Sequence, residues 1–275
     1  MKRFTLSSFT VLLLTSGYAV AEDYQSISNA QYMKTEADNV SIDTSMLNTT
    51  YYLSKKSTLG PLDQFDYINT TSNIFASYMH TSLDDDTYDA SSDSLRIGGE
   101  YFLGKFLIGA SYQNTDYDDG DSDATSLRLG YLFSKNFLVQ AEVLDLDDGG
   151  TEYLFSAAYN HQINGSDYLG FTARSDNDFD YKSISAKYFM KLNQGQYFIT
   201  ELMYQDGKYD NYWGASASYY FDDNTSISAD YDDNDNYRLG VKHFINKNIA
   251  LSAGYGANTD ESDYDVIDVG LTFQF

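Results

Sequence analysis

Most of this chain alternates apolar and polar side chains at every second residue. From about residue 65 onward the pattern recurs in stretches of about ten residues, and in one of them Leu95, Ile97 and Tyr101 share a face. The same spacing occurs at Phe106, Ile108, Ala110 and Tyr112, at Leu127, Leu129, Tyr131 and Phe133, and at Trp213, Ala215, Ala217, Tyr219 and Phe221. A period of two is typical of a β-strand with one apolar face. The chain is therefore predicted to consist almost entirely of such strands.

The links between these stretches are of two kinds that take turns along the chain. One kind is a short turn, as in "LGK" at 103–105 and "NKN" at 246–248, and the other is rich in Asp, as in "DYDDGDSD" at 116–123. This rhythm predicts about sixteen strands between residues 23 and 275, with the two before residue 65 least clearly marked. An even number returns both termini to one rim. A sheet of this size avoids open edges by closing into a barrel.

The barrel can be water-soluble, with its apolar face inward, or membrane-spanning, with that face outward. A soluble barrel of sixteen strands needs a wide apolar core, which Ala and Tyr at every second position cannot fill. A transmembrane barrel needs an apolar outer band, a wet polar lumen and aromatic residues at both interfaces. The chain has 27 Tyr and 17 Phe. We therefore predict an all-β, transmembrane, antiparallel up-and-down barrel of about sixteen strands, with short periplasmic turns and Asp-rich extracellular loops.

The beginning of the chain predicts export. Lys2 and Arg3 precede an apolar stretch at 9–14 and the small-residue site at 19–21, which is typical of a signal peptide cleaved after Ala21. Residues 1–21 are thus the expected signal peptide and 22–275 the expected barrel domain. Removal of residues 1–21 changes the formal charge from −24 to −26, because this segment carries Lys2 and Arg3 and no acidic residue. The acidity argues against a nucleic-acid partner, and the absence of cysteine excludes disulfides.

The end of the chain carries a family resemblance. Val269, Leu271, Phe273 and the terminal Phe275 alternate with polar residues, and this pattern resembles the C-terminal signal of Gram-negative outer-membrane barrels. The resemblance implies recognition by the barrel-assembly machinery. In addition, "TYYLSKKSTLGPLDQFDYINTTSNIFASY" at 50–78 resembles the family of putative general bacterial porins, in which a Gly-Pro-Leu linker follows a "TYYF" strand end. Gly60, Pro61 and Leu62 match the linker, while 63–66 depart from its more usual Ala/Glu run.

The charged residues on the polar face are the candidates for function. We expect ten of them to line the pore: Arg96, Glu100, Arg128, Glu142, Arg174, Lys187, Glu201, Asp230, Arg238 and Lys242. The arginines lie a few residues from Asp-rich links, which predicts a shared height near the outer mouth. Glu100, Glu142, Glu201 and Lys187 are expected nearer the middle. Such charges can face each other across water and sort solutes, or they can simply be solvated or paired wall residues.

Other chemistry has weaker signals. "DYDDGD" at 116–121 and "DYDDND" at 230–235 space Asp residues like a calcium loop, but neither has Gly at the sixth place and Glu at the twelfth. A solvated acidic surface is the preferred interpretation, so no metal site or cofactor is expected. His80, His161 and His243 share parity with the apolar face and fit an interfacial girdle. No spacing singles out a catalytic triad, and no enzyme activity is expected.

These patterns favour a porin that forms a passive, water-filled channel for small hydrophilic solutes or ions, with a mild cation preference. The alternative is a structural or surface-interaction barrel with an occluded lumen and acidic loops that bind cations or partners. General porins usually fold a long loop into the lumen, and no link here is obviously long enough. Expected partners are outer-membrane lipids and lipopolysaccharide, the assembly machinery and small solutes. A homotrimer rests on resemblance alone.

Overall fold

The structure is a computed structural model that describes residues 23–58, 60–63, 68–85, 88–147, 149–192, 195–208, 210–261 and 263–275. The predicted signal peptide lies outside these residues. In them the chain forms sixteen strands. The strands are β1 (Asp23–Ala37), β2 (Val40–Ser57), β3 (Asn73–Asp85), β4 (Tyr88–Leu103), β5 (Phe106–Tyr117), β6 (Gly120–Ser134), β7 (Phe137–Leu146), β8 (Gly150–Gln162), β9 (Tyr168–Asp176), β10 (Lys182–Lys191), β11 (Tyr197–Asp206), β12 (Asn211–Tyr220), β13 (Thr225–Asp232), β14 (Asn236–Asn246), β15 (Ile249–Asn258) and β16 (Tyr264–Gln274).

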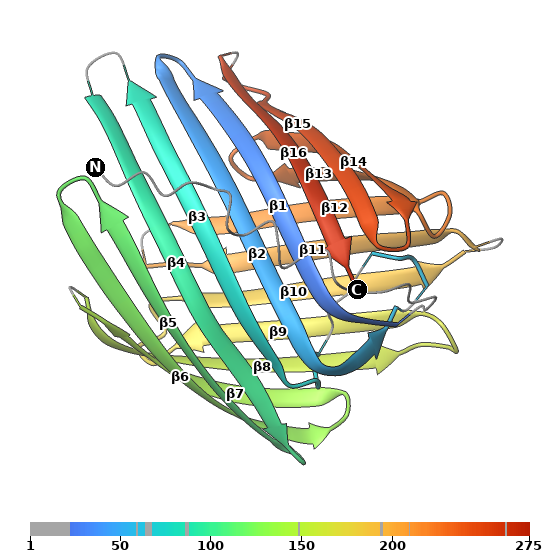
Figure 1. Ribbon diagram of the computed structural model, residues 1–275. Helices are drawn as coiled ribbons and strands as arrows, with labels where there is room; N and C mark the ends of the chain where they lie inside the picture. The colour runs from blue at the N-terminus through green and yellow to red at the C-terminus, as the bar shows by residue number, and fades with distance from the viewer. Residues whose placement is uncertain are drawn as a thin grey trace.

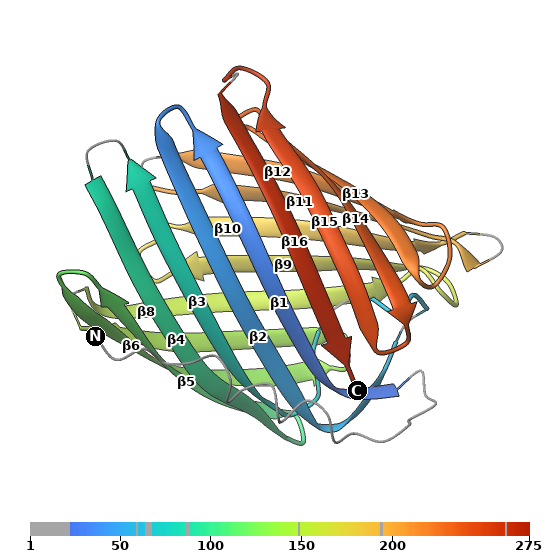
Figure 2. The same cartoon turned by 45° about the horizontal axis from the view of Figure 1, so that its top comes forward.

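The strands form one closed antiparallel barrel. Each strand pairs with the next along the chain, and β1 pairs with β16 from Ile27↔Gln274 to Ala37↔Tyr264. Figures 1 and 2 show the strongly tilted strands of this ring, with the start of β1 beside the C-terminus. The prediction of an up-and-down barrel of about sixteen strands is confirmed. β1 and β2, the least clearly marked in the sequence, are among the longest strands, with 15 and 18 residues.

The apolar side chains point out of the barrel. Leu127 and Leu129 on β6 are 61% and 64% exposed, and many other large apolar side chains are exposed on the outer face, as on the lipid-facing surface of a transmembrane barrel. Aromatic rings gather on the outer face near the rim that carries the termini. Phe106, Tyr131, Phe133 and Phe137 make successive ring contacts with centroids 4.9–5.3 Å apart. This arrangement is the interfacial girdle expected of a transmembrane barrel. In the described part of the chain no helix is long and apolar enough to cross a membrane.

The two rims of the barrel differ in chemistry. The terminal rim, where β1 begins and β16 ends, carries the connections at 58–72, 104–105, 135–136, 163–167, 192–196, 221–224 and 247–248. The opposite end, the acidic rim, carries the Asp-rich hairpins. The β5–β6 hairpin is less loop-like than the sequence suggests, because β5 ends at Tyr117 and β6 begins at Gly120. Most of its predicted Asp-rich loop residues thus extend the strands, whereas residues 177–180 and 259–261 of other Asp-rich links lie outside the strands.

The last strand closes the ring. Val269 on its outer face is 50% exposed, and Asp268 on its inner face is 2% exposed. Beyond the strand, the N–H of Phe275 donates to the carbonyl of Ser26 (2.9 Å), and the N–H of Ser26 donates to the carbonyl of Phe275 (2.7 Å). The terminal residue therefore continues the ladder between β16 and β1, and the two ends of the chain hold each other. The role of this stretch as an assembly signal stays a prediction.

Candidate functional site: the inner wall

Charged side chains line the inner face of the barrel. Along the strands that carry them they alternate with the outward apolar residues, and the pairing places some of them beside each other across strands, as in Arg128↔Glu142 and Lys187↔Glu201. The ten residues predicted to line a pore share this face: Arg96, Glu100, Arg128, Glu142, Arg174, Lys187, Glu201, Asp230, Arg238 and Lys242. Their part in solute passage remains a prediction, but their geometry defines what the wall can do.

Arg128 joins two carboxylates into one cluster. Its Nη1 donates to Glu100 Oε1 (2.6 Å), and its Nε and Nη2 donate to Glu142 Oε2 (3.2 and 2.9 Å). Gly109 stands between Glu100 and Arg128 in the sheet, and a Cβ there would lie only 3.4 Å from Arg128 Cβ. Glu100, Gly109, Arg128 and Glu142 form one row across four strands. The expectation that Arg128 lies higher than the two glutamates is therefore wrong: distance to a link does not report height in strands of unequal length.

Arg238 forms the second cluster, at the closure of the barrel. Its Nε and Nη2 bond both oxygens of Asp268 at 2.8 Å, a bidentate pair, and its Nη1 lies 3.6 Å from Asp230. Gly254 makes room for this pair, since a Cβ there would lie 2.2 Å from Asp268 Oδ2 and 2.5 Å from Arg238 Nη2. The pair connects β14 to β16 across β15. Bidentate pairing and near-complete burial of Asp268 make it the most constrained charge pair in the described wall.

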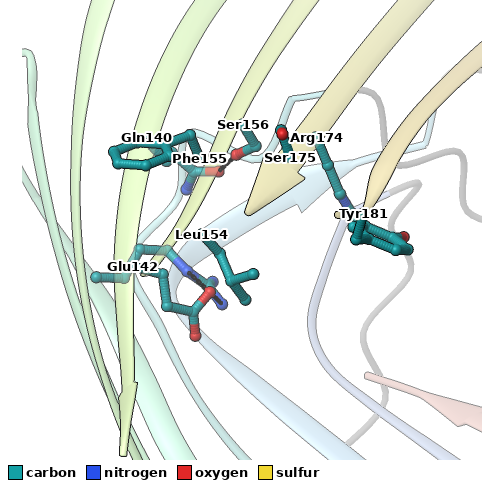
Figure 3. Close-up of a pocket in the computed structure, with 9 residues that line it drawn as sticks. Gln140, Glu142, Leu154, Phe155, Ser156, Arg174, Ser175 and Tyr181 are labelled. Atoms are coloured by element: carbon teal, nitrogen blue, oxygen red, sulfur yellow. Dashed lines mark hydrogen bonds and ion pairs between the residues drawn. The ribbon is translucent and has the colours of Figure 1, made fainter. Parts of the chain in front are cut away.

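The other basic residues of the wall differ in the partners that they contact. Lys187 pairs with Glu201 at 2.9 Å. Arg96 donates to Ser111 Oγ (3.2 Å) and stands over the Phe75 ring at 5.4 Å. Arg174 makes no hydrogen bond or ion pair to the part of the chain that the structure describes, and it lines a hollow of about 410 Å³ with Arg128, Glu142 and Tyr181. Figure 3 shows the Arg174 side chain extending toward Tyr181. Most of these charges thus pair along the wall, whereas Arg174 faces the hollow without an ionic partner among the described residues.

The connection between β2 and β3 reaches the far side of the barrel. The Leu62 N–H donates to the carbonyl of Asp223 (2.9 Å), and the Leu62 carbonyl accepts from Gln274 Nε2 (3.2 Å). The Asp63 carboxylate pairs with Lys242 Nζ (2.6 Å) and accepts from the Tyr220 hydroxyl (3.1 Å). In the ring these partners belong to or adjoin β12, β13, β14 and β16, whereas the connection leaves from β2 and returns to β3. Figure 1 shows its light-blue trace beside the C-terminus.

The same connection explains why apolar residues occur on the wet face. Leu62 is buried with Phe244 and Ala250, and Ile68 packs against Leu107, Leu132 and Leu138 on β5, β6 and β7. The connection thus touches two separate flanks of the inner wall near the terminal rim. The sequence suggested that no link is obviously long enough to fold into the lumen, and the contacts of Leu62 and Ile68 show that this expectation is wrong. It was based on the length of the Asp-rich links, whereas the crossing segment lies on the other rim.

Gly60 and Pro61 shape this crossing. Gly60 has a φ of +150°, and a Cβ there would lie 2.6 Å from the Tyr197 ring. Pro61 is fully buried. Glycine therefore lets the backbone lie against the ring, and the fixed φ of proline orients Leu62 toward its apolar seat. The Gly-Pro-Leu match noted in the sequence thus falls on the anchor of the crossing segment.

The three histidines have separate partners in the described part of the chain. His80 contacts Asp93 (2.9 Å), His161 stacks on Tyr159, and His243 contacts Thr225 (3.0 Å). All three lie on the outer face. Within the residues that the structure describes, no group of three or more His, Cys, Asp or Glu side chains could hold a metal ion.

A closed barrel with an apolar outside, an aromatic girdle and a charged, hydrated inner wall defines the class of outer-membrane channels. The chain belongs to the family described as putative general bacterial porin, whose model matches residues 1–275. Family and fold therefore place the protein in the outer membrane as a porin that passes small solutes, and they indicate a channel rather than an enzyme.

Solved structures show the same fold. The chain is similar to the outer membrane protein Omp33 of Acinetobacter baumannii, with 16% identity and a TM-score of 0.51 over 92% of this chain and 99% of that chain. It is also similar to a triple mutant of the Rhodopseudomonas blastica porin, with 11% identity and a TM-score of 0.51 over 91% of this chain and 99% of that chain. CdiB from Acinetobacter baumannii matches with 12% identity and a TM-score of 0.58 over 91% of this chain and 60% of that chain. No curated protein matches the chain significantly.

Proposed function

We propose that this porin is a passive, water-filled channel for small hydrophilic solutes or ions, with a mild preference for cations. The observation that carries the proposal is the contrast between the two faces of one sheet. Leu127 and Leu129 point outward, while Arg128 between them is held inside by Glu100 and Glu142. Charged side chains need water or partners, so this wall supports a hydrated lumen.

The cation preference follows from charge. The mature chain is expected to carry −26, which is −24 less the two charges of Lys2 and Arg3. Carboxylates concentrate on the acidic rim, through which solutes would enter from outside. A field of one sign at a mouth raises the local concentration of counter-ions. Pairing along the wall, as in Lys187–Glu201, keeps the field inside the lumen modest.

The β2–β3 connection sets the expected constriction. Leu62 and Asp63 are anchored on the β12–β16 flank and Ile68 on the β5–β7 flank, so these described parts of the connection project into the lumen near the terminal rim. Solutes would have to pass beside it. The size limit of the channel therefore depends on this segment.

Conductance of the refolded barrel in a planar bilayer tests the proposal. We expect discrete current steps in KCl and a reversal potential that favours K⁺ over Cl⁻ in a salt gradient. A barrel that is folded by gel mobility and inserts without steps would reject the channel, and a reversal potential of the opposite sign would reject the cation preference.

The second candidate is a barrel whose lumen is occluded, with acidic loops that bind cations or partners. The anchored crossing of Leu62 and Asp63 favours it, because both residues are held by several bonds. Absence of conductance in the native chain, with conductance after removal of 60–63, would support this alternative. Cleavage after Ala21, recognition of Phe275 by the assembly machinery and a homotrimer are further proposals for this family member.

A further inference from the structure

The inner wall holds a second hollow of about 440 Å³, nearer the acidic rim than the crossing segment. It is lined by β11–β16 and β1. Two features of its lining are unusual for a wet wall. It gathers carboxylates that exceed their cationic partners, and it gathers apolar and aromatic side chains that no crossing segment covers.

The charges in this hollow do not cancel. Arg238 gives its two short bonds to Asp268 and lies 3.6 Å from Asp230, whose side chain is 43% exposed. Glu201 is paired by Lys187. Asp232 accepts from the backbone N–H groups of Asn234 and Asn236 and from the Asn236 amide, all neutral donors. Four carboxylates thus face two cations, which leaves a formal excess of two negative charges at Asp230 and Asp232.

The apolar part of the lining is equally specific. Met33 on β1 and Met203 on β11 face the hollow from opposite sides, and Tyr212 on β12 lies between the acidic groups and Met203. Tyr212 folds over Gly214, where a Cβ would lie 3.1 Å from the Tyr212 hydroxyl oxygen. The glycine therefore lets the ring lie along the wall. Thioethers and aromatic rings are polarisable surfaces that attract apolar groups and cations.

Together these features select one kind of ligand. An inorganic cation would use the carboxylates and leave Met33, Met203 and Tyr212 facing water. A neutral apolar solute would leave the excess negative charge at Asp230 and Asp232 uncompensated. We propose that this hollow, the β11–β1 pocket, is a subsite for an organic cation, a primary amine or guanidinium on an apolar or aromatic body. The inference rests on the proposed channel function and adds a solute class to it.

Current block by three matched probes tests this subsite. The probes are phenethylammonium, with charge and body, ethylammonium, with charge alone, and 3-phenylpropionate, with body and opposite charge. Each probe is added at low concentration to the KCl solution on the side of the bilayer that the acidic rim faces. We expect phenethylammonium to block at a concentration about tenfold lower than ethylammonium, because it also buries a ring, and 3-phenylpropionate to leave the current unchanged.

Variants assign the block to the pocket. Asp230→Asn should weaken the phenethylammonium block about threefold, measured as the blocked fraction of the variant's own KCl current, as expected for one partly exposed charge. Met203→Gln should reduce the difference between the blocking concentrations of phenethylammonium and ethylammonium, because it removes the apolar contact. Asp119→Asn makes the same charge change in the exposed β5–β6 turn and should leave the block unchanged.

The outcomes separate the subsite from the channel. No KCl steps would reject the proposed function itself. Normal steps with equal block by the two ammonium probes, or a block that Asp119→Asn weakens as much as Asp230→Asn, would overturn the subsite and leave the channel standing.

Discussion

The carboxylate of Asp63 lies 2.6 Å from the Nζ of Lys242, although 179 positions separate the two residues in the chain. Asp63 belongs to the connection that leaves β2, and Lys242 stands on the inner face of β14. Both side chains are about three-quarters buried. The pair therefore fastens the crossing segment to the opposite flank of the barrel wall.

Breaking this pair should loosen the constriction. Lys242→Met removes the cation and leaves Asp63 with the Tyr220 hydroxyl, at a cost of about 1 kcal/mol in docking of the segment. That corresponds to about a fivefold change in the ratio of docked to undocked forms. We expect a larger or noisier conductance in bilayer recordings. Lys187→Met is the matched control, because its partner Glu201 is on the wall itself. Equal changes in both variants would contradict a role for the segment.

A covalent lock provides the reverse experiment. The chain has no cysteine, so Leu62→Cys with Ala250→Cys introduces a single pair at two residues that pack together. We expect oxidation to hold the segment in place and suppress current fluctuations, and a reductant to restore them. Each single cysteine variant should be insensitive to redox state. Fluctuations that persist in the fully crosslinked channel would show that the segment does not gate the current.

Removing Arg128 should shift selectivity and stability together. Arg128→Met leaves Glu100 and Glu142 without their cation, and Glu100 keeps only the neutral Asn73 amide among the partners described. Cation preference should therefore rise, and the barrel should lose about 1–3 kcal/mol. Arg174→Met also removes a positive charge, but this residue has no ionic partner among the described residues, so only selectivity should change. Reversal potentials and urea unfolding measure the two effects. Equal loss of stability in both variants would contradict the cluster.

The barrel closure depends on the space at Gly254. Gly254→Ala places a Cβ where the Arg238–Asp268 pair now lies. We expect a loss of about 1–3 kcal/mol, since a nearly buried carboxylate loses its best donors, seen as a lower temperature at which the folded band converts on a denaturing gel. Gly165→Ala is the control, because nothing lies within 4 Å of its added Cβ. An unchanged conversion temperature in Gly254→Ala would exclude this role.

Asp167 lies in the 163–167 connection on the terminal rim. We expect its carboxylate to make the free energy of unfolding fall at acid pH. The Lys191 N–H donates to this carboxylate (3.0 Å), and with the Asn164 amide and the Ser166 hydroxyl it lowers the pKa of Asp167. The folded pKa thus lies below the unfolded value of about 3.9. The stabilisation is present above that value and is lost as the pH falls through the folded pKa. Asp167→Asn should reduce this acid dependence in urea unfolding below about pH 4. A steeper acid loss in the variant would refute the assignment.

The alternation along each strand was enough to separate an apolar face from a polar one, because successive side chains of a strand point to opposite faces. Leu127 and Leu129 therefore share one face and Arg128 the other, whatever the neighbours are. The number of strands then assigned the apolar face to lipid, because Ala and Tyr cannot fill the core of so wide a barrel. Alternation of the links likewise placed both termini on one rim and most of the negative charge at the other. The final strand, Tyr264–Gln274, was recognisable from its own residues.

Which residues meet was settled only by closure of the ring. Arg128 contacts Glu100 across Gly109, and Arg238 contacts Asp268 across Gly254, because the stagger of each strand against the next accumulates around the barrel. That stagger depends on strand lengths and bulges, and no local pattern states it. Strand lengths also placed most of the Asp-rich stretch at 116–123 within β5 and β6 rather than in a loop. The destination of Gly60, Pro61 and Leu62 was hidden for the same reason: their seat on Phe244 and Ala250 exists only once the barrel has closed.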